Sequence, residues 1–263
     1  MKVGERSRDK SHVACLMSDE RHKTSAVRPR HESSIPFSSP CDAPMPQGIG
    51  QVPERRFCGK TVILAAGDFP SHPVPLAALF SASAIVCCDS AAAELVACGF
   101  SPDAIVGDLD SLPADLKERF ADRLFPVAEQ DDNDLAKAFR FTLGKGWRDI
   151  VILGATGKRE DHTLGNISWL ADFAPLADSV VMLTDNGLFQ ALQAPGGTIR
   201  VEPGDQISLF SFDPSVAVSA EGLKYPVDNL HLRRWWTATL NEAVSDTVSF
   251  HFASGTLLAY IAW

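Results

Sequence analysis

Residues 105–111 read IVGDLDS, an apolar strand end that breaks at a glycine and continues into two carboxylates one residue apart. Side chains alternate along an extended backbone, so Asp108 and Asp110 are expected on one side of it. Two like charges held that close need a cation to neutralise them. The stretch therefore predicts a divalent metal site at the end of a buried strand.

A second acidic cluster, QDDNDLAK, follows at residues 130–137. Asp131 and Asp134 are three residues apart, which predicts neighbours on one face of a first helical turn, where the helix dipole favours carboxylates. Taken alone, these acids need do no more than complement that dipole. Beside Asp108 and Asp110, oxygen ligands without a nearby His or Cys pair suit Mg²⁺ better than zinc, and Mg²⁺ implies phosphates.

Apolar runs and helical stretches alternate on both sides of these clusters, which predicts an open, mostly parallel α/β sheet with helices on both faces. In such sheets the ligand binds beyond the carboxyl ends of the strands, at the switch point of strand order. Asp89, Asp108, Asp110 and Gly154 all fall at such ends. Strands are expected within 61–68 and at 84–88, 104–106, 124–127, 150–153 and 180–183, and helices at 74–83, 90–98, 113–120, 135–143 and from about 161 to 169.

The last of these strand ends opens the loop GATGKREDHTLGN at residues 154–166. Its glycines let the backbone approach an anion, Lys158 and Arg159 add positive charge, and a helix beginning near Asp161 points its N-terminus at the same place. The Walker pattern is absent, so the loop predicts a phosphate cradle of another kind. Lys158 by itself is more typical of a solvated loop residue, and His162 is as apt to orient a neighbour as to touch substrate.

After about residue 187 the chain changes to short β-rich segments separated by turn signals, such as PGG at 195–197. This pattern predicts a small all-β sandwich. It carries the motifs GLKYP at 222–226 and WWTATLNE at 235–242. The clearest expected strands are 206–212, 244–252 and 256–263.

The bulk composition, with 263 residues of which 45% are hydrophobic and 22% charged, fits a globular protein with a sizeable core. Residues 1–57 are rich in Ser, Pro, Arg, His and Glu. We expect them to be a disordered tail, or an over-long start with Met45 as the alternative first residue. The α/β domain is then expected over 58–186 and the all-β domain over 187–263.

Charge and cysteine content narrow the class of protein. The net charge is −9. Residues 1–58 contain 10 Lys/Arg and 7 Asp/Glu, so the rest of the chain has 14 Lys/Arg against 26 Asp/Glu, a charge near −12. This negative charge argues against a nucleic-acid surface. The six cysteines include no C-x-x-C pair, and Cys87 and Cys88 are expected to pack in a buried strand. With no signal peptide and no apolar run of about 18 to 20 residues, we expect reduced thiols in a cytoplasmic protein away from membranes.

With these motifs assembled, the chain resembles the thiamine pyrophosphokinase family from about Val62 onward. The resemblance implies transfer of a diphosphoryl group from ATP to the hydroxyethyl oxygen of thiamine, giving thiamine diphosphate and AMP. It also implies an ATP-binding catalytic domain at 58–186, a thiamine-binding β-sandwich at 187–263, and a homodimer with thiamine at the subunit interface. It rests on five motifs in order, namely Asp89 and residues 107–111, 130–137, 154–166 and 222–226.

The resemblance also implies roles for individual residues. Asp89, Asp108, Asp110 and Asp134 would surround Mg²⁺, with Asp131 close by. The residues implied to face the ATP phosphates and the reacting centre are Gln130, Asp131, Lys137, Gly154, Gly157, Arg159 and Asp161. Those implied to bind thiamine are Tyr225, Thr239, Asn241 and Trp236. Asn241 would form hydrogen bonds with the pyrimidine. Trp235 or Trp236 could stack on its ring, and packing in the core or at an interface is an equal alternative for both.

The chain departs from the family pattern at two places. Ser90-Ala91 follow Asp89 where the family has glycine, and the added side chains put the close approach of the backbone to the nucleotide in doubt. Leu240 stands where the family has a serine hydroxyl. Two alternatives stay open: a related diphosphokinase acting on another alcohol such as a hydroxymethyl pterin, and a non-catalytic thiamine or nucleotide sensor. The 222–226 motif favours thiamine, and a sensor would not need a full set of acids. Which acid accepts the alcohol proton is also open.

Overall fold

The computed structural model describes residues 54–129 and 131–263. The expected tail therefore lies almost entirely outside the described residues, as does Gln130. The end of the predicted tail is structured, because Glu54–Phe57 forms the short 3-10 helix η2 and the Phe57 ring is buried. Regular structure is therefore present before residue 58, where the composition predicted that the tail would end.

One ten-stranded sheet runs through the described chain in the order β12-β9-β14-β7-β6-β5-β1-β2-β3-β4. The six strands from β6 to β4 are all parallel. The chain builds outward from β1 to β4, then returns to β5 on the other side of β1, so strand order switches between β1 and β5. The parallel strands are β1 (Thr61–Leu64), β2 (Ala84–Cys88), β3 (Ala104–Gly107), β4 (Leu124–Pro126), β5 (Asp149–Leu153) and β6 (Ser179–Thr184).

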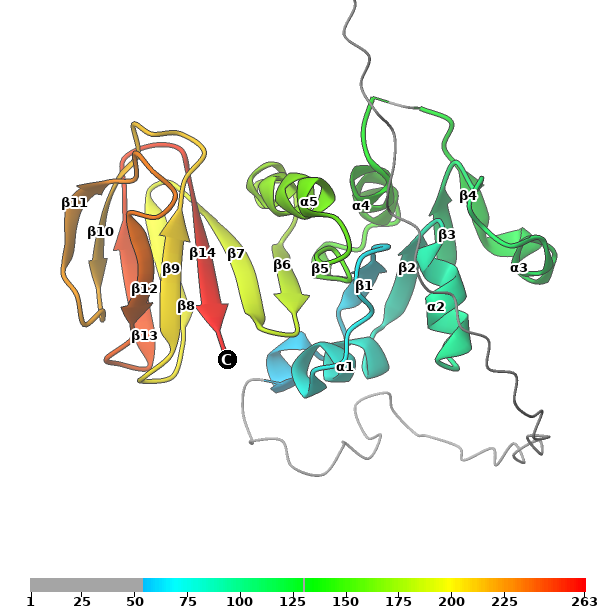
Figure 1. Cartoon of the computed structure of the whole chain (residues 1–263), viewed down its shortest axis with the longest axis horizontal. Helices are drawn as coiled ribbons and strands as arrows, with labels where there is room; N and C mark the ends of the chain where they lie inside the picture. The colour runs from blue at the N-terminus through cyan, green and yellow to red at the C-terminus, as the bar shows by residue number, and fades with distance from the viewer. Residues whose placement is uncertain (1–53, 130) are drawn as a thin grey trace, which may run out of the picture. The chain divides into compact units, whose positions relative to one another are not determined.

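Helices cover both faces of this parallel part (Figure 1), as the alternation of the sequence predicted. Alternate residues of β1 belong to different cores: Val62 packs with α1 and α2, whereas Ile63 packs with α4 and α5. A strand covered on both faces has to be apolar throughout, which explains the continuous apolar runs. The helices are α1 (Pro73–Phe80), α2 (Ala91–Ala97), α3 (Ala114–Arg119), the 3-10 helix η3 (Ala121–Arg123), α4 (Asp134–Gly144) and α5 (Glu160–Phe173). Among the described residues, every helix is too short or too polar to cross a bilayer.

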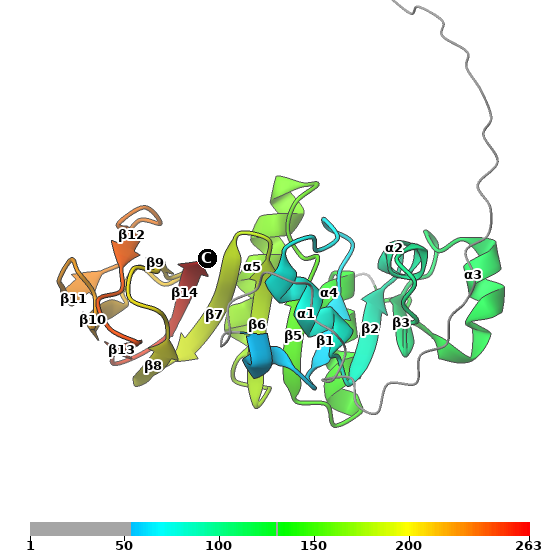
Figure 2. The ribbon, with the colours of Figure 1, turned by 90° about the horizontal axis from the view of Figure 1, so that it is seen from below.

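Beyond β6 the same sheet continues with antiparallel strands. A second, four-stranded sheet of order β11-β10-β13-β8 packs on this end (Figure 2) and completes the predicted sandwich. Leu209 and Leu257 of the long sheet share one core with Val248 and Phe250 of the short one. The strands are β7 (Gly187–Gln193), β8 (Gly196–Arg200), β9 (Gln206–Phe210), β10 (Ala217–Glu221), β11 (Val227–His231), β12 (Ala238–Glu242), β13 (Thr247–His251) and β14 (Thr256–Ala262).

The sequence indicated β9, β13 and β14 individually but none of the other sandwich strands. Two of the missed strands are irregular: the pairing register shifts within β10 between Val218 and Ala220, and within β12 between Ala238 and Asn241. A bulge breaks the two-residue alternation on which strand prediction depends. The boundary expected at 186/187 falls in the turn between β6 and β7, and the sheet continues across it without a break.

Candidate active site

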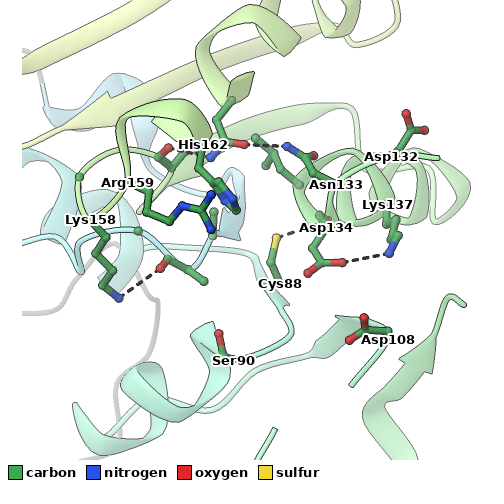
Figure 3. A pocket seen from close by; sticks show the side chains of 17 residues that line it. Cys88, Ser90, Asp108, Asp132, Asn133, Asp134, Lys137, Lys158, Arg159 and His162 are labelled. Atoms are coloured by element: carbon green, nitrogen blue, oxygen red, sulfur yellow. Dashed lines mark hydrogen bonds and ion pairs between the residues drawn. The ribbon is translucent and has the colours of Figure 1, made fainter. Parts of the chain in front are cut away.

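A cavity of about 430 Å³ opens at the carboxyl ends of β1, β2, β3 and β5, beside the switch point. This is where the sequence placed the ligand. In Figure 3, Lys158, Arg159 and His162 lie on one side of it, and Asp134 and Lys137 on the other. The polar side chains that line it come from the loops after these strands and from the starts of α4 and α5, namely Ser90, Asp108, Asp132, Asn133, Asp134, Lys137, Lys158, Arg159, His162 and Asn166.

Two backbone loops form the floor of the cavity. The loop after β1 pairs with the loop after β5, since Gly67 N–H donates to the Gly154 carbonyl at 2.6 Å and Asp68 N–H to the Thr156 carbonyl at 2.9 Å. A side chain on Gly67 would lie 2.3 Å from the Thr156 carbonyl oxygen, so only glycine fits. Gly157 lines the cavity with φ +79°, a conformation that favours glycine. The predicted close approach of backbone to an anion is therefore built into the fold.

Helix α5 begins beside this floor, with Arg159 as its N-cap residue and Glu160 as its first. The Arg159 guanidinium and the Asp161 carboxylate form a two-point ion pair, with Nε–Oδ1 3.0 Å and Nη2–Oδ2 2.5 Å. This pairing raises the pKa of Arg159 and lowers that of Asp161. Arg159 lines the cavity but Asp161 does not, so Asp161 orients the arginine from behind in this structure.

Asp89 follows β2 directly and is buried, with only 4% of its surface exposed, and it is not among the residues that line the cavity. Its Oδ2 accepts a hydrogen bond from the Ser111 N–H at 3.3 Å, whereas its Oδ1 has no hydrogen-bond partner among the described residues. Burial raises the pKa of Asp89 against the opposing hydrogen bond from Ser111, and the charges of Asp134 and Asp108 raise it further. A buried, unpartnered carboxylate oxygen among like charges is suited to a cation.

The backbone around Asp108 differs from the sequence prediction. Leu109 has φ +64°, and the Asp108 carboxylate accepts a hydrogen bond from the Asp110 N–H at 3.1 Å. The chain therefore turns after β3, and the expectation of an extended backbone through Asp108 and Asp110 is wrong. Asp108 lines the cavity, while Asp110 is exposed outside its lining. The physical reason is local, because an Asp side chain readily bonds its own backbone two residues on.

Helix α4 begins at Asp134, one residue before the predicted start at 135 but after Asp131. Asn133 is its N-cap, with Oδ1 accepting the Ala136 N–H at 3.0 Å, so Asp131 precedes the helix and shares no helical face with Asp134. Asp132 lines the cavity in its place and forms an ion pair with Arg140. The predicted Asp131–Asp134 pairing is therefore wrong. The Asn-Asp sequence at 133–134 was the available signal that the helix starts after Asp131, since Asn is a preferred N-cap residue.

Lys137 is the buried cation of the site. Its side chain is 3% exposed, and its Nζ lies 3.1 Å from the Asp134 Oδ1. Both residues line the cavity, as predicted for them separately. A buried lysine needs a partner of opposite charge, and Asp134 provides it. The other carboxylate oxygen of Asp134 faces the cavity region (Figure 3).

Sequence reasoning did not assign the contacts made by Lys158 and Asn166. Lys158 has φ +57°, and its Nζ donates to the Ala66 carbonyl at 3.1 Å and to the Glu94 carboxylate at 2.9 Å. Asn166 donates from Nδ2 to the Ala155 carbonyl at 2.8 Å. Both side chains tie the loop after β5 to its surroundings. Ser90, where glycine was expected, has ordinary helical angles of φ −61° and ψ −18°, so its side chain causes no strain.

The described His, Cys, Asp and Glu side chains include no preassembled group of three that could hold a metal ion. The donor chemistry nevertheless fits a hard cation, since Asp89, Asp108 and Asp134 are close enough for the other two charges to raise the pKa of Asp89. The orphaned Oδ1 of Asp89 is the specific observation that favours a cation there.

The residues expected to bind thiamine lie elsewhere, around edge strand β12. Asn241 is 8% exposed, and its amide clamps the backbone of Tyr225: Oδ1 accepts the Tyr225 N–H at 3.0 Å, and Nδ2 donates to the Tyr225 carbonyl at 2.9 Å. Trp236 is 73% exposed, and Thr239 donates to its carbonyl oxygen at 3.2 Å. None of these four residues lines the cavity.

A smaller apolar cavity of about 140 Å³ lies between α5 and the antiparallel strands. Trp235 borders it, with its ring edge-on to Phe212 at a centroid distance of 5.7 Å, whereas Trp236 does not. Its full lining is Leu164, Ile167, Phe189, Phe210, Phe212, Trp235 and Leu258. The two adjacent tryptophans therefore have different environments.

Known proteins share this arrangement. The model for the thiamin pyrophosphokinase catalytic domain matches residues 77–182, and that for its substrate-binding domain matches residues 187–260. Thiamine pyrophosphokinase of Bacillus subtilis (strain 168) is 29% identical over 180 residues, covering 65% of this chain and 83% of that protein. Thiamine pyrophosphokinase 1 of Oryza sativa subsp. japonica is 30% identical over 145 residues, 49% of this chain and 54% of that protein.

A solved structure agrees with the sequence comparisons. Thiamin pyrophosphokinase from Geobacillus thermodenitrificans superposes with a TM-score of 0.65 at 26% identity, covering 77% of this chain and 97% of that one. Two adjoining domain models, related sequences and a shared fold agree, and so this chain belongs to the thiamin pyrophosphokinase family.

Proposed function

We propose that the chain is a Mg²⁺-dependent enzyme that transfers the diphosphoryl group of ATP to the hydroxyethyl oxygen of thiamine, giving thiamine diphosphate and AMP. The observation that carries this proposal is the cavity at the switch point, whose lining combines the carboxylates of Asp108 and Asp134 with the backbone of Gly67 and Gly157. Asp89, directly after β2, adds a buried carboxylate oxygen without a hydrogen-bond partner among the described residues. One side of the site suits a cation and the other suits phosphate oxygens, as a metal-bound nucleotide requires.

In this proposal Mg²⁺ is held by Asp89, Asp108 and Asp134, with Asp110 as a fourth carboxylate from the turn after β3. Bound there, the ion would neutralise charge on the phosphate oxygens. The pKa of Asp89 is raised mainly by burial and further by the charges of Asp134 and Asp108, and a cation bound there would offset both effects.

The nucleotide is assigned to the floor and its rim. Phosphate oxygens would accept hydrogen bonds from the backbone around Gly154 and Gly157 and would face the N-terminus of α5. Arg159 and Lys137 supply positive charge, with Arg159 oriented by Asp161. Asp131, which precedes α4, and Gln130, which lies outside the described residues, are proposed as further contacts of the nucleotide.

The reaction forms a bond from the thiamine hydroxyl oxygen to the β-phosphorus and breaks the bond from that phosphorus to the oxygen bridging to the α-phosphate. AMP leaves with that oxygen, and the hydroxyl loses its proton. Charge spreads over the non-bridging oxygens of the transferred group, where Arg159 and Lys137 stabilise it. Holding the two reactants in line supplies much of the remaining acceleration.

Thiamine is assigned to the surface around β12, and a second copy of the chain is proposed to bring this surface to the cavity. A single chain leaves large apolar side chains exposed there: Tyr225 59%, Trp236 73% and Leu240 69%. Exposed apolar groups on an edge strand are typical of an interface. In a homodimer, Trp236 would stack on thiamine and Tyr225, Thr239 and Asn241 would shape its site. A cytoplasmic location completes the proposal.

The test is AMP release from ATP and Mg²⁺ by purified protein, with thiamine, a hydroxymethyl pterin or no acceptor. Thiamine-dependent AMP with an equal amount of thiamine diphosphate is the expected result. A preference for the pterin would replace the acceptor within the same chemistry. Nucleotide binding without AMP release under any condition would contradict the enzymatic proposal and favour a sensor.

A further inference from the structure

The start of α1 is held by a carboxylate more than one hundred residues away. Asp185, in the turn between β6 and β7, accepts hydrogen bonds at Oδ1 from the Ser71 and His72 N–H groups, each at 3.0 Å. The Ser71 hydroxyl donates to its Oδ2. Burial would raise the pKa of Asp185, but these hydrogen bonds bring it below its ordinary value. One side chain thus fixes two consecutive residues of a distant loop.

Trp263 closes over the same place. Its indole Nε1 donates to the Asp185 carbonyl at 3.2 Å, and its ring stacks on that of His72 at a centroid distance of 5.5 Å and an interplanar angle of 11°. His72 in turn accepts the Val74 N–H at Nδ1 and so caps α1. We call Ser71, His72, Asp185 and Trp263 the clasp. It joins the β1–α1 loop to β6 and β14 of the same sheet.

The clasp lies at the far end of a loop that forms the cavity. Residues 65–67 of this loop line the cavity and are hydrogen-bonded to the loop after β5. Four residues later, Ser71 enters the clasp. Because Gly67 contacts the Thr156 and Gly154 carbonyls without room for a side chain, a small shift of the β1–α1 loop would disturb the floor. The loop is therefore held at both ends, once by the floor and once by the clasp.

We infer that Asp185 and Trp263 are positioning residues for nucleotide binding, which act by holding the β1–α1 loop in the shape that the cavity floor requires. This inference rests on the proposed nucleotide site. Neither residue lines the cavity, so each acts through Ser71 and His72. The alternative is that these residues only stabilise the start of α1. Their substitution would then lower the melting temperature without a specific effect on nucleotide binding.

The chain offers a matched control in Asp213. Its Oδ1 accepts hydrogen bonds from the Ser215 N–H at 2.8 Å and from the Ser215 hydroxyl at 2.6 Å, the same two donor types that Ser71 offers to Asp185. It lies between β9 and β10, and neither Asp213 nor Ser215 lines the cavity. Asp213→Asn therefore removes a similar carboxylate contact without touching the β1–α1 loop.

The experiment measures the Kd of a non-hydrolysable ATP analogue with Mg²⁺ by calorimetry, together with the melting temperature. Asp185→Asn and Trp263→Ala are expected to weaken binding about ten-fold, as loss of a charge-assisted hydrogen bond does. Trp263→Phe keeps the ring stack and loses only the indole donor, so its loss is expected to be smaller. Asp213→Asn should leave Kd unchanged, whatever its effect on the melting temperature.

Wild-type binding in both Asp185→Asn and Trp263→Ala would overturn the inference and leave the clasp a purely structural feature. An equal loss of affinity in Asp213→Asn would also overturn it, since general destabilisation would then be the cause. If Asp185→Asn does not fold, Trp263→Phe and Trp263→Ala decide the question. A wild-type chain that binds no nucleotide would overturn the proposed function, and the inference with it.

Discussion

The residues proposed for function are buried or line a cavity at one end of the long sheet and are largely exposed at the other. At the parallel end a cavity within one chain is lined by several of the residues proposed for metal and nucleotide, among them Asp108, Asp134 and Lys137, and Asp89 and Lys137 are both buried. At the antiparallel end the residues proposed for thiamine lie on an edge strand, and Trp236 is largely exposed. Under the proposed function, a single chain would complete its nucleotide site but only half of its acceptor site.

The comparison has a topological cause. Parallel strands present all their carboxyl ends on one edge, so short loops after β1, β2, β3 and β5 meet without help from another molecule. An antiparallel sandwich instead presents an edge, and β12 is the edge of this sheet. Leu240 in that strand has φ +60° and is 69% exposed, so it leaves apolar surface uncovered on a single chain.

The strongest test of the comparison is Asp89→Asn. Loss of the proposed metal ligand is expected to reduce turnover at least about 100-fold, equivalent to about 3 kcal/mol of barrier. Asp110→Asn should also abolish Mg²⁺-dependent turnover. Only Asp89→Asn is expected to raise the stability of the metal-free protein, because Asp89 is buried and Asp110 is exposed. Steady-state kinetics and melting with and without Mg²⁺ check this, and unchanged activity in either variant would remove that residue from the metal site.

At the other end, Trp236→Ala is expected to raise KM for thiamine about ten-fold, as loss of one aromatic stacking contact does, with KM for ATP unchanged. The melting temperature of the isolated chain should hardly change, because the side chain is 73% exposed. Initial rates with each substrate varied separately give the two KM values. Trp235→Ala is the paired variant. It should lower stability, because Trp235 borders the apolar cavity and contacts Phe212. A change in KM for ATP in Trp236→Ala would break the proposed division of roles.

Lys158→Gly sharpens the account of the cavity floor. The substitution removes the hydrogen bonds to Ala66 and Glu94 and relieves a left-handed residue that costs about 1 kcal/mol. These effects oppose each other, so stability should change little, while KM for ATP rises about three-fold as one exposed charge contact is lost. Lys158→Asn, which also tolerates this conformation, is the control for strain. A KM for ATP equal to wild type in Lys158→Gly would show that the lysine only occupies the loop.

The smallest expected effect is the pH dependence of the metal-free protein. The folded protein holds the proton of Asp89 more tightly than the unfolded chain, whose pKa is near the ordinary 3.8. At low pH Asp89 is protonated in both states and does not change the free energy of unfolding. As pH rises from about 3.8 through the raised pKa of the folded state, Asp89 lowers the free energy of unfolding. Urea unfolding across that range should show a smaller decline in Asp89→Asn. An identical decline in both proteins would contradict the assignment.

Much of the fold followed from local pattern. The strand at 84–88 was predicted to the residue, since five apolar residues between polar stops have few alternatives. Asp89, Asp108 and Gly154 were placed at strand ends for the same reason, and Gly157 in a cradle. The errors at Asp110 and Asp131 were also local, because Asp and Asn side chains that bond to nearby backbone redirect the chain within two or three residues.

By itself, then, the sequence determined what short-range periodicity and motif order encode: the parallel α/β half, the β-rich half, the acids at strand ends and the resemblance to a family. Only the tertiary structure decided that one sheet joins the halves, that Lys137 is buried against Asp134, that Asn241 clamps Tyr225, and that Trp263 meets Asp185. Such contacts depend on which surfaces pack together across many residues, and no local pattern of side chains specifies them.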